Sequence, residues 1–245
     1  MTYKTQGVVI RRTSYKEADL LIKLFTKEKG KVAVIAKGSR KIRSKLGGSL
    51  EPFYLNEYML AEGKTLDTIC GSQVKKRRLH LRGDLKKMAY AYYFSEIIDK
   101  LLPEREKNLK IYNLYNDALD FLEHDEKLAA VYFELNIFKI LGFGPVTDSC
   151  VSCHKDIVES DNSGLSCDFG GTICPDCIRK GLRYQAISIP AIKYMRIISG
   201  FDLSVASKVK EKEKMLEEIR SFNIEYLKMI SHYPIKTEKF IVNLS

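Results

Sequence analysis

Long hydrophobic runs are missing from this sequence of 245 residues. A membrane-spanning helix needs roughly 18 or more apolar residues in succession, but the most apolar stretch, residues 129–146, is interrupted by Glu134 and Lys139. The amino-terminal residues also lack the unbroken apolar core of a secretory signal peptide. We therefore expect a cytoplasmic protein with no membrane partner.

Catalytic motifs are missing as well. The four histidines show neither metal-binding spacing nor the spacing of a nucleophile and its base. The chain has no glycine-rich phosphate loop ending in Lys-Ser/Thr and no Gly-x-Ser-x-Gly turn. Its acidic residues are scattered over positions typical of helix surfaces. The sequence therefore predicts a protein that is not an enzyme.

The sequence has six cysteines, and four of them form two Cys-x-x-Cys pairs, Cys150 with Cys153 and Cys174 with Cys177. In the reducing cytoplasm these thiols are better metal ligands than disulfide partners. The spacing is typical of a zinc site. Four thiolates fill the tetrahedron and leave no open coordination position, so we expect one structural Zn²⁺ ion.

Alternatives to this ligand set stay open. An iron–sulfur cluster also uses four cysteines, although paired turns across a short insertion favour zinc. Cys167 and His154 are spare candidates for a ligand position. Cys70 lies in a strand-like run, where we expect a small buried residue.

Positive charge is concentrated at one end of the chain, which carries a net charge of +10. Residues 1–80 contain 18 Lys and Arg against 7 Asp and Glu, whereas the other 165 residues contain 23 basic and 24 acidic residues. Such asymmetry indicates a polyanionic partner, either nucleic acid or an anionic membrane surface.

The first third of the chain reads as short strands and the rest as helices, which predicts an α+β fold. Five β-rich segments favour a five-stranded barrel like the oligonucleotide-binding fold, although an SH3-like barrel would give a similar pattern. These expected strands are Thr5–Arg11, Asp19–Thr26, Lys31–Ala36, Phe53–Ala61 and Thr65–Val74.

Apolar spacings of three and four then predict helices. They are Leu85–Leu102, Leu109–Leu122, Lys127–Leu141, Ala191–Ser199 and Lys208–Ser231. The aromatic residues of the first helix, Tyr90, Tyr92, Tyr93 and Phe94, are expected to pack in a core rather than to form a base-stacking platform. We expect an oligonucleotide-binding-fold-like nucleic-acid-binding domain over residues 1–80. A helical domain follows over residues 81–245, with a zinc-binding insertion at about 146–182.

A basic loop lies between the third and fourth expected strands. Five cations fall within the nine residues 37–45, with small residues between them. Such a loop suits phosphate groups, which it would contact independently of sequence. With nearby cations and a second basic run at 75–78, the predicted nucleic-acid-binding residues are Arg11, Arg12, Lys16, Lys37, Arg40, Lys41, Arg43, Lys45, Lys75, Lys76, Arg77 and Arg78.

Several short motifs, in order along the chain, resemble the bacterial DNA repair family RecO. In the first third they are QGVVI at 6–10, YKEADLL at 15–21, LFTKEKGK at 24–31, AKGSR at 36–40 and LGGSLEPF at 46–53. LRGDL at 81–85, ILGF at 140–143 and the two Cys-x-x-Cys pairs follow in the same order. Beyond about residue 200 the resemblance fades.

This resemblance implies an oligonucleotide-binding barrel and a zinc-containing helical domain. It also implies binding to single- and double-stranded DNA, annealing of complementary strands, and a place on the nucleoid. Proteins of this kind act with RecR on DNA coated by single-stranded-DNA-binding protein and help RecA to load.

Two other functions compete with this one. An RNA-binding or transcription-associated zinc protein would share the basic barrel, and comparing DNA with RNA competitors would separate the two. A zinc-dependent nucleic-acid enzyme would need an open coordination position, which four cysteine ligands deny.

Overall fold

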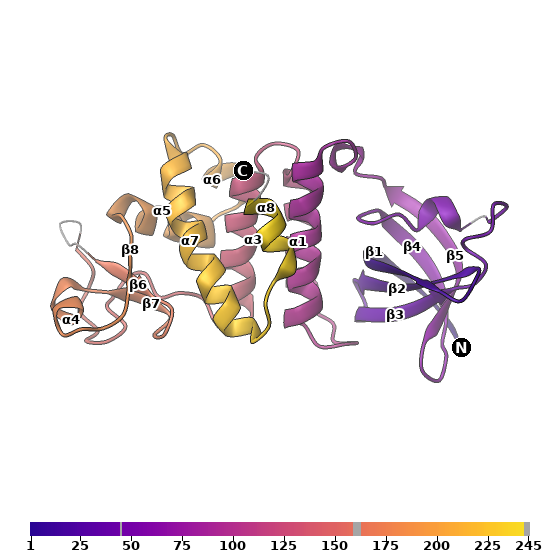
Figure 1. Ribbon diagram of the computed structural model, residues 1–245, viewed down its shortest axis with the longest axis horizontal. Helices are drawn as coiled ribbons and strands as arrows, with labels where there is room; N and C mark the ends of the chain where they lie inside the picture. Colours follow the sequence, from indigo (N-terminus) through magenta and orange to yellow (C-terminus); the bar gives the residue numbers. More distant parts are fainter. Residues whose placement is uncertain (45, 159–162, 243–245) are drawn as a thin grey trace. The chain divides into compact units, whose positions relative to one another are not determined.

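The computed structural model describes residues 1–44, 46–158 and 163–242 (Figure 1). The chain divides into two compact units, one of residues 1–123 with the end of the chain from Lys239, the other of residues 124–238. The expected domain boundary at residue 80 marks the change from strands to helices and stays a prediction. Within the described residues, no helix is long and apolar enough to cross a membrane.

The first unit begins with a closed barrel of five strands (Figure 1). The order around the barrel is β1-β2-β3-β5-β4, with β3 and β5 parallel and the other neighbours antiparallel. Closure leaves no free sheet edge, as in oligonucleotide-binding barrels, so the predicted fold class is confirmed. The strands are β1 (Thr2–Tyr15), β2 (Asp19–Thr26), β3 (Gly30–Ala36), β4 (Leu55–Ala61) and β5 (Asp67–Lys76).

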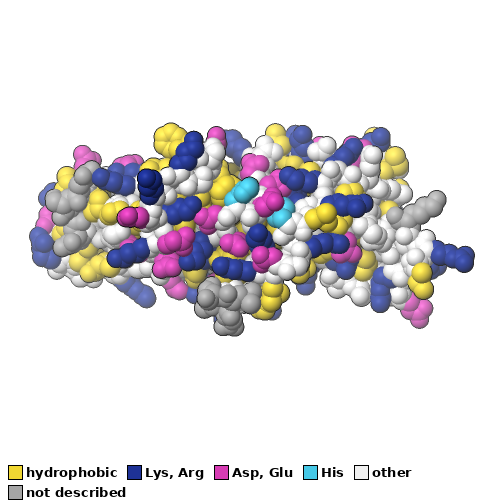
Figure 2. All heavy atoms as spheres, turned by 90° about the horizontal axis from the view of Figure 1, so that it is seen from above, with side chains coloured by type: hydrophobic (Ala, Val, Ile, Leu, Met, Phe, Trp, Pro, Cys, Tyr) yellow, Lys and Arg dark blue, Asp and Glu magenta, His cyan; other side chains and the backbone are white. Residues whose placement is uncertain are grey.

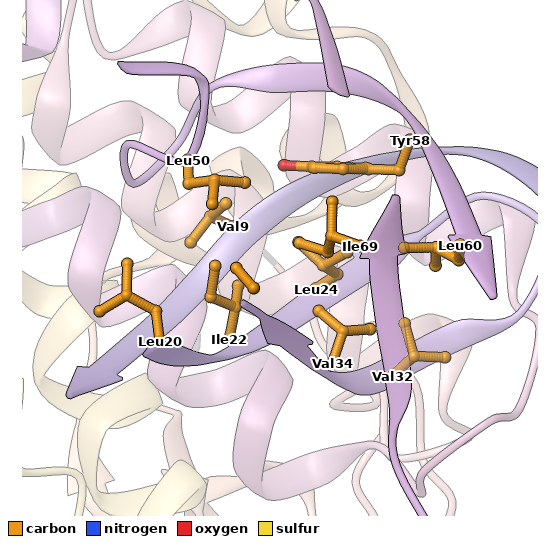
Figure 3. Packing of buried hydrophobic residues seen from close by; sticks show 11 residues of the cluster. Val9, Leu20, Ile22, Leu24, Val32, Val34, Leu50, Tyr58, Leu60 and Ile69 are labelled. Carbon is orange, nitrogen blue, oxygen red and sulfur yellow. The ribbon is translucent and has the colours of Figure 1, made fainter. Parts of the chain in front are cut away.

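Alternating apolar residues fill the barrel (Figure 3). Leu20, Ile22 and Leu24 of β2 point inward at every second position, because successive side chains of a strand face opposite sides. Val32 and Val34 of β3 join them, and all five side chains are buried. Each buried aliphatic side chain contributes about 1.5–3 kcal/mol relative to exposure.

The short helix η1 (Gly47–Ser49) lies between β3 and β4, and η2 (Leu79–Leu81), α1 (Leu85–Leu101) and α2 (Leu109–Phe121) follow the barrel. The Asp84 carboxylate accepts hydrogen bonds from the first backbone N–H groups of α1, which fixes where that helix begins. The expected core role is confirmed for Tyr90, Tyr93 and Phe94, which are buried. Tyr92 is the exception, with 39% of its surface exposed.

The second unit is built on α3 (Glu126–Ile140), α5 (Ile189–Gly200) and α7 (Lys212–Ser231), which pack against one another (Figure 1). The fully buried Glu134 of α3 accepts hydrogen bonds from Arg220 Nη1 at 2.7 Å and Asn223 Nδ2 at 2.9 Å, both on α7. The last long helix begins at Lys212 and not at Lys208 as expected, because Glu211 adopts a left-handed conformation (φ 52°).

A small three-stranded sheet in the order β7-β6-β8 lies between α3 and α5 in the chain. Its strands of two or three residues are too short to produce a readable alternation, and the sequence did not predict them. The elements not yet given are β6 (Gly164–Ser166), β7 (Gly171–Ile173), α4 (Pro175–Arg179), β8 (Gln185–Ala186), α6 (Leu203–Ala206) and α8 (Lys236–Val242).

Gly30→Ala tests the turn between β2 and β3. Gly30 has a φ of +62°, and an added Cβ would lie 1.9 Å from the Glu106 carbonyl oxygen. We expect the free energy of unfolding, measured in urea, to fall by about 3 kcal/mol or more, because left-handed strain and a backbone clash add up.

Gly83→Ala is the matched control. Gly83 also has a positive φ (+89°), but no atom lies within 4 Å of its added Cβ. The control should therefore lose only the strain contribution of about 1–2 kcal/mol. Equal losses in the two variants would show that the approach of Glu106 does not constrain the turn.

Candidate nucleic-acid interface and metal centre

The basic loop after β3 is anchored at its base and open at its tip. Gly38 N donates to Asp19 Oδ1 at 2.8 Å, and Arg40 N donates to the Ala18 carbonyl at 3.0 Å. The Arg40 guanidinium also donates to the Glu17 carbonyl at 3.1 Å. Arg40 therefore fixes the loop against the turn between β1 and β2.

The remaining described cations of this loop face solvent. Lys37, Lys41 and Arg43 are exposed, and none forms an ion pair or side-chain hydrogen bond with another described residue. The predicted contact Lys45 lies outside the described residues. Lys16 is exposed in the adjoining turn, where its carbonyl accepts from Arg40 Nη1 at 3.4 Å. The fold thus brings Lys16 next to a loop that begins 21 residues further along the sequence.

Four other predicted contact residues are partly neutralised by carboxylates. Arg12 lies 3.1 Å from Glu51, and Lys76 lies 2.9 Å from Asp120. Lys75 and Arg11 form longer pairs, at 3.6 Å with Glu57 and 3.9 Å with Asp99. These cations are exposed, and exposed pairs are weak, so phosphate groups can compete for them.

Arg77 and Arg78 are neighbours in the sequence but differ in environment. Arg77 is exposed, whereas the Arg78 side chain is 1% exposed. Arg78 donates to Asp120 Oδ1 at 2.7 Å, Asn116 Oδ1 at 2.7 Å and the Phe53 carbonyl at 2.8 Å. Arg78 therefore joins the barrel to α2, and we leave it out of the proposed contact surface.

Basic and acidic side chains are mixed on the surface of the molecule. Figure 2 shows Lys and Arg side chains spread over the visible face and interspersed with Asp and Glu, rather than gathered in one patch. The local environment of each cation is therefore a better guide to an interface than the total charge. Sequence reasoning missed Arg82, which lies 3.4 Å from Glu51 and stands over the Tyr54 ring at 4.9 Å, because no basic run includes it.

The four paired cysteines form one cluster in the second unit. The Sγ atoms of Cys150, Cys153, Cys174 and Cys177 all lie within 4.8 Å of one another. The Cys153 and Cys174 sulfurs are 3.6 Å apart. Four ligands placed tetrahedrally at a Zn–S distance of 2.3 Å would be separated by about 3.8 Å. The cluster is therefore compact enough to hold a metal ion.

Backbone N–H groups supply the electrostatics of the cluster. Burial raises the pKa of the Cys150 thiol, but the N–H groups of Cys174, Cys153 and Ser152 outweigh this effect and lower the pKa to about 6. Burial raises the pKa of Cys174 to about 11. One sulfur is thus already disposed to ionise, and a bound cation would favour the thiolate form of the others.

The two remaining cysteines lie outside this cluster. The Cys167 sulfur is not one of the four clustered sulfurs, and burial raises the pKa of the Cys167 thiol to about 11. Cys70 is exposed on β5, so the expectation that it is buried is wrong. The neighbouring Ile69 faces the barrel interior, and successive side chains of a strand face opposite sides, so Cys70 points outward.

Comparisons with known proteins agree with this architecture. The model of the family "Recombination protein O N terminal" matches residues 1–78, and that of "Recombination protein O C terminal" matches residues 82–234. The protein named DNA repair protein RecO from a strain of Dehalococcoides mccartyi is 34% identical over 219 residues, which cover 89% of this chain and 86% of that protein. The protein of the same name from Symbiobacterium thermophilum is 30% identical over 247 residues, which cover 99% of this chain and 97% of that protein.

The matching family models place this closed barrel, with the helices and the four-cysteine cluster that follow it, among the proteins of DNA repair and recombination. The matches extend over both units, and the chain belongs to the RecO family.

Arg78→Ala tests the assignment of Arg78 to packing. We expect the free energy of unfolding in urea to fall by about 2–4 kcal/mol, because a buried carbonyl and a carboxylate lose their donor. The neighbouring substitution Arg77→Ala is the control and should change stability by no more than about 0.5 kcal/mol. Similar values for both variants would contradict a structural role specific to Arg78.

Proposed function

We propose that this protein is a DNA-binding recombination mediator and not an enzyme. It binds single- and double-stranded DNA through the barrel and anneals complementary strands. With RecR, it helps RecA to load on DNA coated by single-stranded-DNA-binding protein, in the cytoplasm on the nucleoid. Membership of the RecO family supports the mediator role, and the charged surface of the barrel supports the DNA contact.

The observation that carries the DNA-binding proposal is the set of solvent-facing cations on the loop after β3. Lys37, Lys41 and Arg43 form no ion pair with another residue that the structure describes, so they have no such pair to give up when they meet phosphate groups. Contacts of this kind release counterions and give affinity without reading sequence. The proposed surface consists of Arg11, Arg12, Lys16, Lys37, Arg40, Lys41, Arg43, Lys45, Lys75, Lys76 and Arg77.

We propose that the cysteine cluster holds one structural Zn²⁺ ion. The four sulfurs lie close enough together to share one ion, and the lowered pKa of Cys150 favours a thiolate ligand. Such an ion supplies cross-linking rather than catalysis, because four cysteines complete its coordination. The apolar side chains around the cluster are few, among them Ile173, Ile178 and Leu182, so the metal would replace a larger core.

Removing the three solvent-facing cations of the loop tests the DNA contact. We expect Lys37→Ala, Lys41→Ala and Arg43→Ala, combined, to weaken binding similarly for unrelated DNA sequences. The slope of log affinity against log salt should fall by about two to three units, at 0.7 per phosphate for single strands and 0.9 for duplex. Annealing of strands coated by single-stranded-DNA-binding protein should fall in parallel.

The control removes the same charge elsewhere in the first unit. Lys64, Lys107 and Lys110 are exposed, form no ion pair with a described residue and lie outside the proposed surface. Their triple alanine variant should keep most of the salt slope. An unchanged slope in the loop variant would refute the loop as the DNA contact, and equally strong RNA competition would favour an RNA-binding protein.

Metal content tests the second proposal. The purified protein should contain one zinc per chain by elemental analysis, and Cys150→Ser should lower the melting temperature of the second unit, because structural zinc contributes on the order of 10 kcal/mol of apparent binding free energy. Cys70→Ser, at an exposed position, is the control and should change neither quantity. Full stability without bound metal would refute a structural ion.

A further inference from the structure

A small cavity lies in the first unit where the barrel meets η2 and α1. Its volume is about 160 Å³. Among the described residues it is lined by four arginines, Arg12, Arg77, Arg78 and Arg82, and by a single carboxylate, that of Glu51. A cavity with this excess of guanidinium groups favours an anion, since arginine presents planar donors that match the oxygens of phosphate.

Glu51 occupies the place that such an anion would take. Its Oε1 lies 3.1 Å from Arg12 Nη1, and its Oε2 lies 3.4 Å from Arg82 Nη2. One carboxylate thus bridges two arginines from different parts of the unit, one on β1 and one just after η2. A tetrahedral phosphate offers the same two oxygens to the same two donors.

Three of the four arginines are held in position by the surrounding structure. The Arg82 guanidinium stands over the Tyr54 ring at 4.9 Å from the centroid, Arg78 is fixed by its bond to Asp120 at 2.7 Å, and Arg12 pairs with Glu51. Arg77 is exposed and forms no hydrogen bond or ion pair with another described residue. The guanidinium groups of the other three are therefore oriented before any ligand binds, which lowers the cost of ordering them.

The size and lining of the cavity select the part of a nucleotide that fits. Pockets that enclose drug-sized molecules measure about 300–1,000 Å³, so this cavity accommodates a phosphate group rather than a whole nucleotide. The aromatic side chains in its wall offer little stacking surface. Phe53 and Tyr54 are buried, and Tyr92 meets Phe53 edge-on, with their centroids 4.8 Å apart.

The cavity is also within reach of the basic loop. Arg12 lies on β1 four residues before Lys16, which adjoins the loop through its contact with Arg40. Four residues of extended chain span about 13 Å. A single DNA strand can therefore contact the loop and the cavity with nearby phosphates.

We propose that this cavity binds one backbone phosphate of single-stranded DNA, and that Glu51 takes the place of this phosphate in the free protein. The inference rests on the proposed DNA-binding function. Exposed ion pairs are weak, so the incoming phosphate displaces the carboxylate at a modest cost. Glu51 thereby lowers the affinity for DNA and keeps Arg12 and Arg82 partnered when no DNA is bound.

Glu51→Gln tests this proposal, because it removes the charge and keeps the size of the side chain. Binding of a fluorescent single-stranded oligonucleotide should become about three- to tenfold tighter, the range expected when one or two exposed ion pairs no longer compete. Glu62→Gln is the matched control. Glu62 is 41% exposed against 32% for Glu51, and it pairs with Lys29, which lies outside the proposed surface.

A second comparison separates the proposed site from a general effect of charge. In a protein that also carries Arg12→Ala and Arg82→Ala, the gain from Glu51→Gln should disappear. A gain no larger than that of Glu62→Gln, or one that persists without the two arginines, would overturn the proposal. Melting temperatures check folding, and Glu51→Asp, which is too short to bridge both arginines, should give a smaller gain and serves if Glu51→Gln does not fold.

The outcomes also distinguish this inference from the function on which it depends. If the wild-type protein does not bind DNA, the proposed function fails; if it binds and Glu51→Gln brings no gain, only the cavity assignment fails. Oligonucleotides with a 5′-phosphate and a 5′-hydroxyl should bind equally. A marked preference for the 5′-phosphate would overturn the assignment to a backbone phosphate and point to strand ends.

Discussion

The barrel closes because β1 is long enough to pair with two different strands. Its first half, Thr2–Val8, pairs with β4, and its second half, from Gly7 to Tyr15, pairs with β2. A shift of register between Val9 and Arg11 allows the strand to change partners, since a bulge bends and twists a strand. The features on which the DNA-binding proposal depends lie at or beside this second half. It carries Arg12, and the turn that follows it supports the basic loop.

Each unit also contains a charged group that is buried and fully engaged. Arg78 joins the end of β5 to α2 in the first unit, and Glu134 joins α3 to α7 in the second. Removing a charge from water is costly, and such groups persist where hydrogen bonds satisfy them. Their donors and acceptors have fixed directions, so they specify how the helices pack more narrowly than apolar contacts do.

Sequence periodicity predicted the strands and the main helices because burial on one face leaves a regular pattern. It predicted β1 too short, as Thr5–Arg11, because the exposed residues after Arg11 pair only within a hairpin and show no apolar alternation. The cysteine cluster was predictable from spacing alone, since a tetrahedral site constrains its ligands locally. The bridge from Glu51 to Arg12 and Arg82 was not, because it joins segments whose proximity arises only from the fold.

In the run Lys75–Arg78, neighbouring cations differ in the substitutions that the structure accepts. At position 77 the side chain is exposed, so lysine would replace arginine with little effect on the stability of the fold. At position 78 the backbone is left-handed, with φ of 47°, and the guanidinium serves several acceptors at once. Lysine there would keep the charge and lose the geometry, because a single ammonium group cannot reach acceptors that the planar fork spans. Two adjacent arginines of identical chemistry therefore differ in the substitutions that the fold accepts, because only the second has its guanidinium geometry built into the packing.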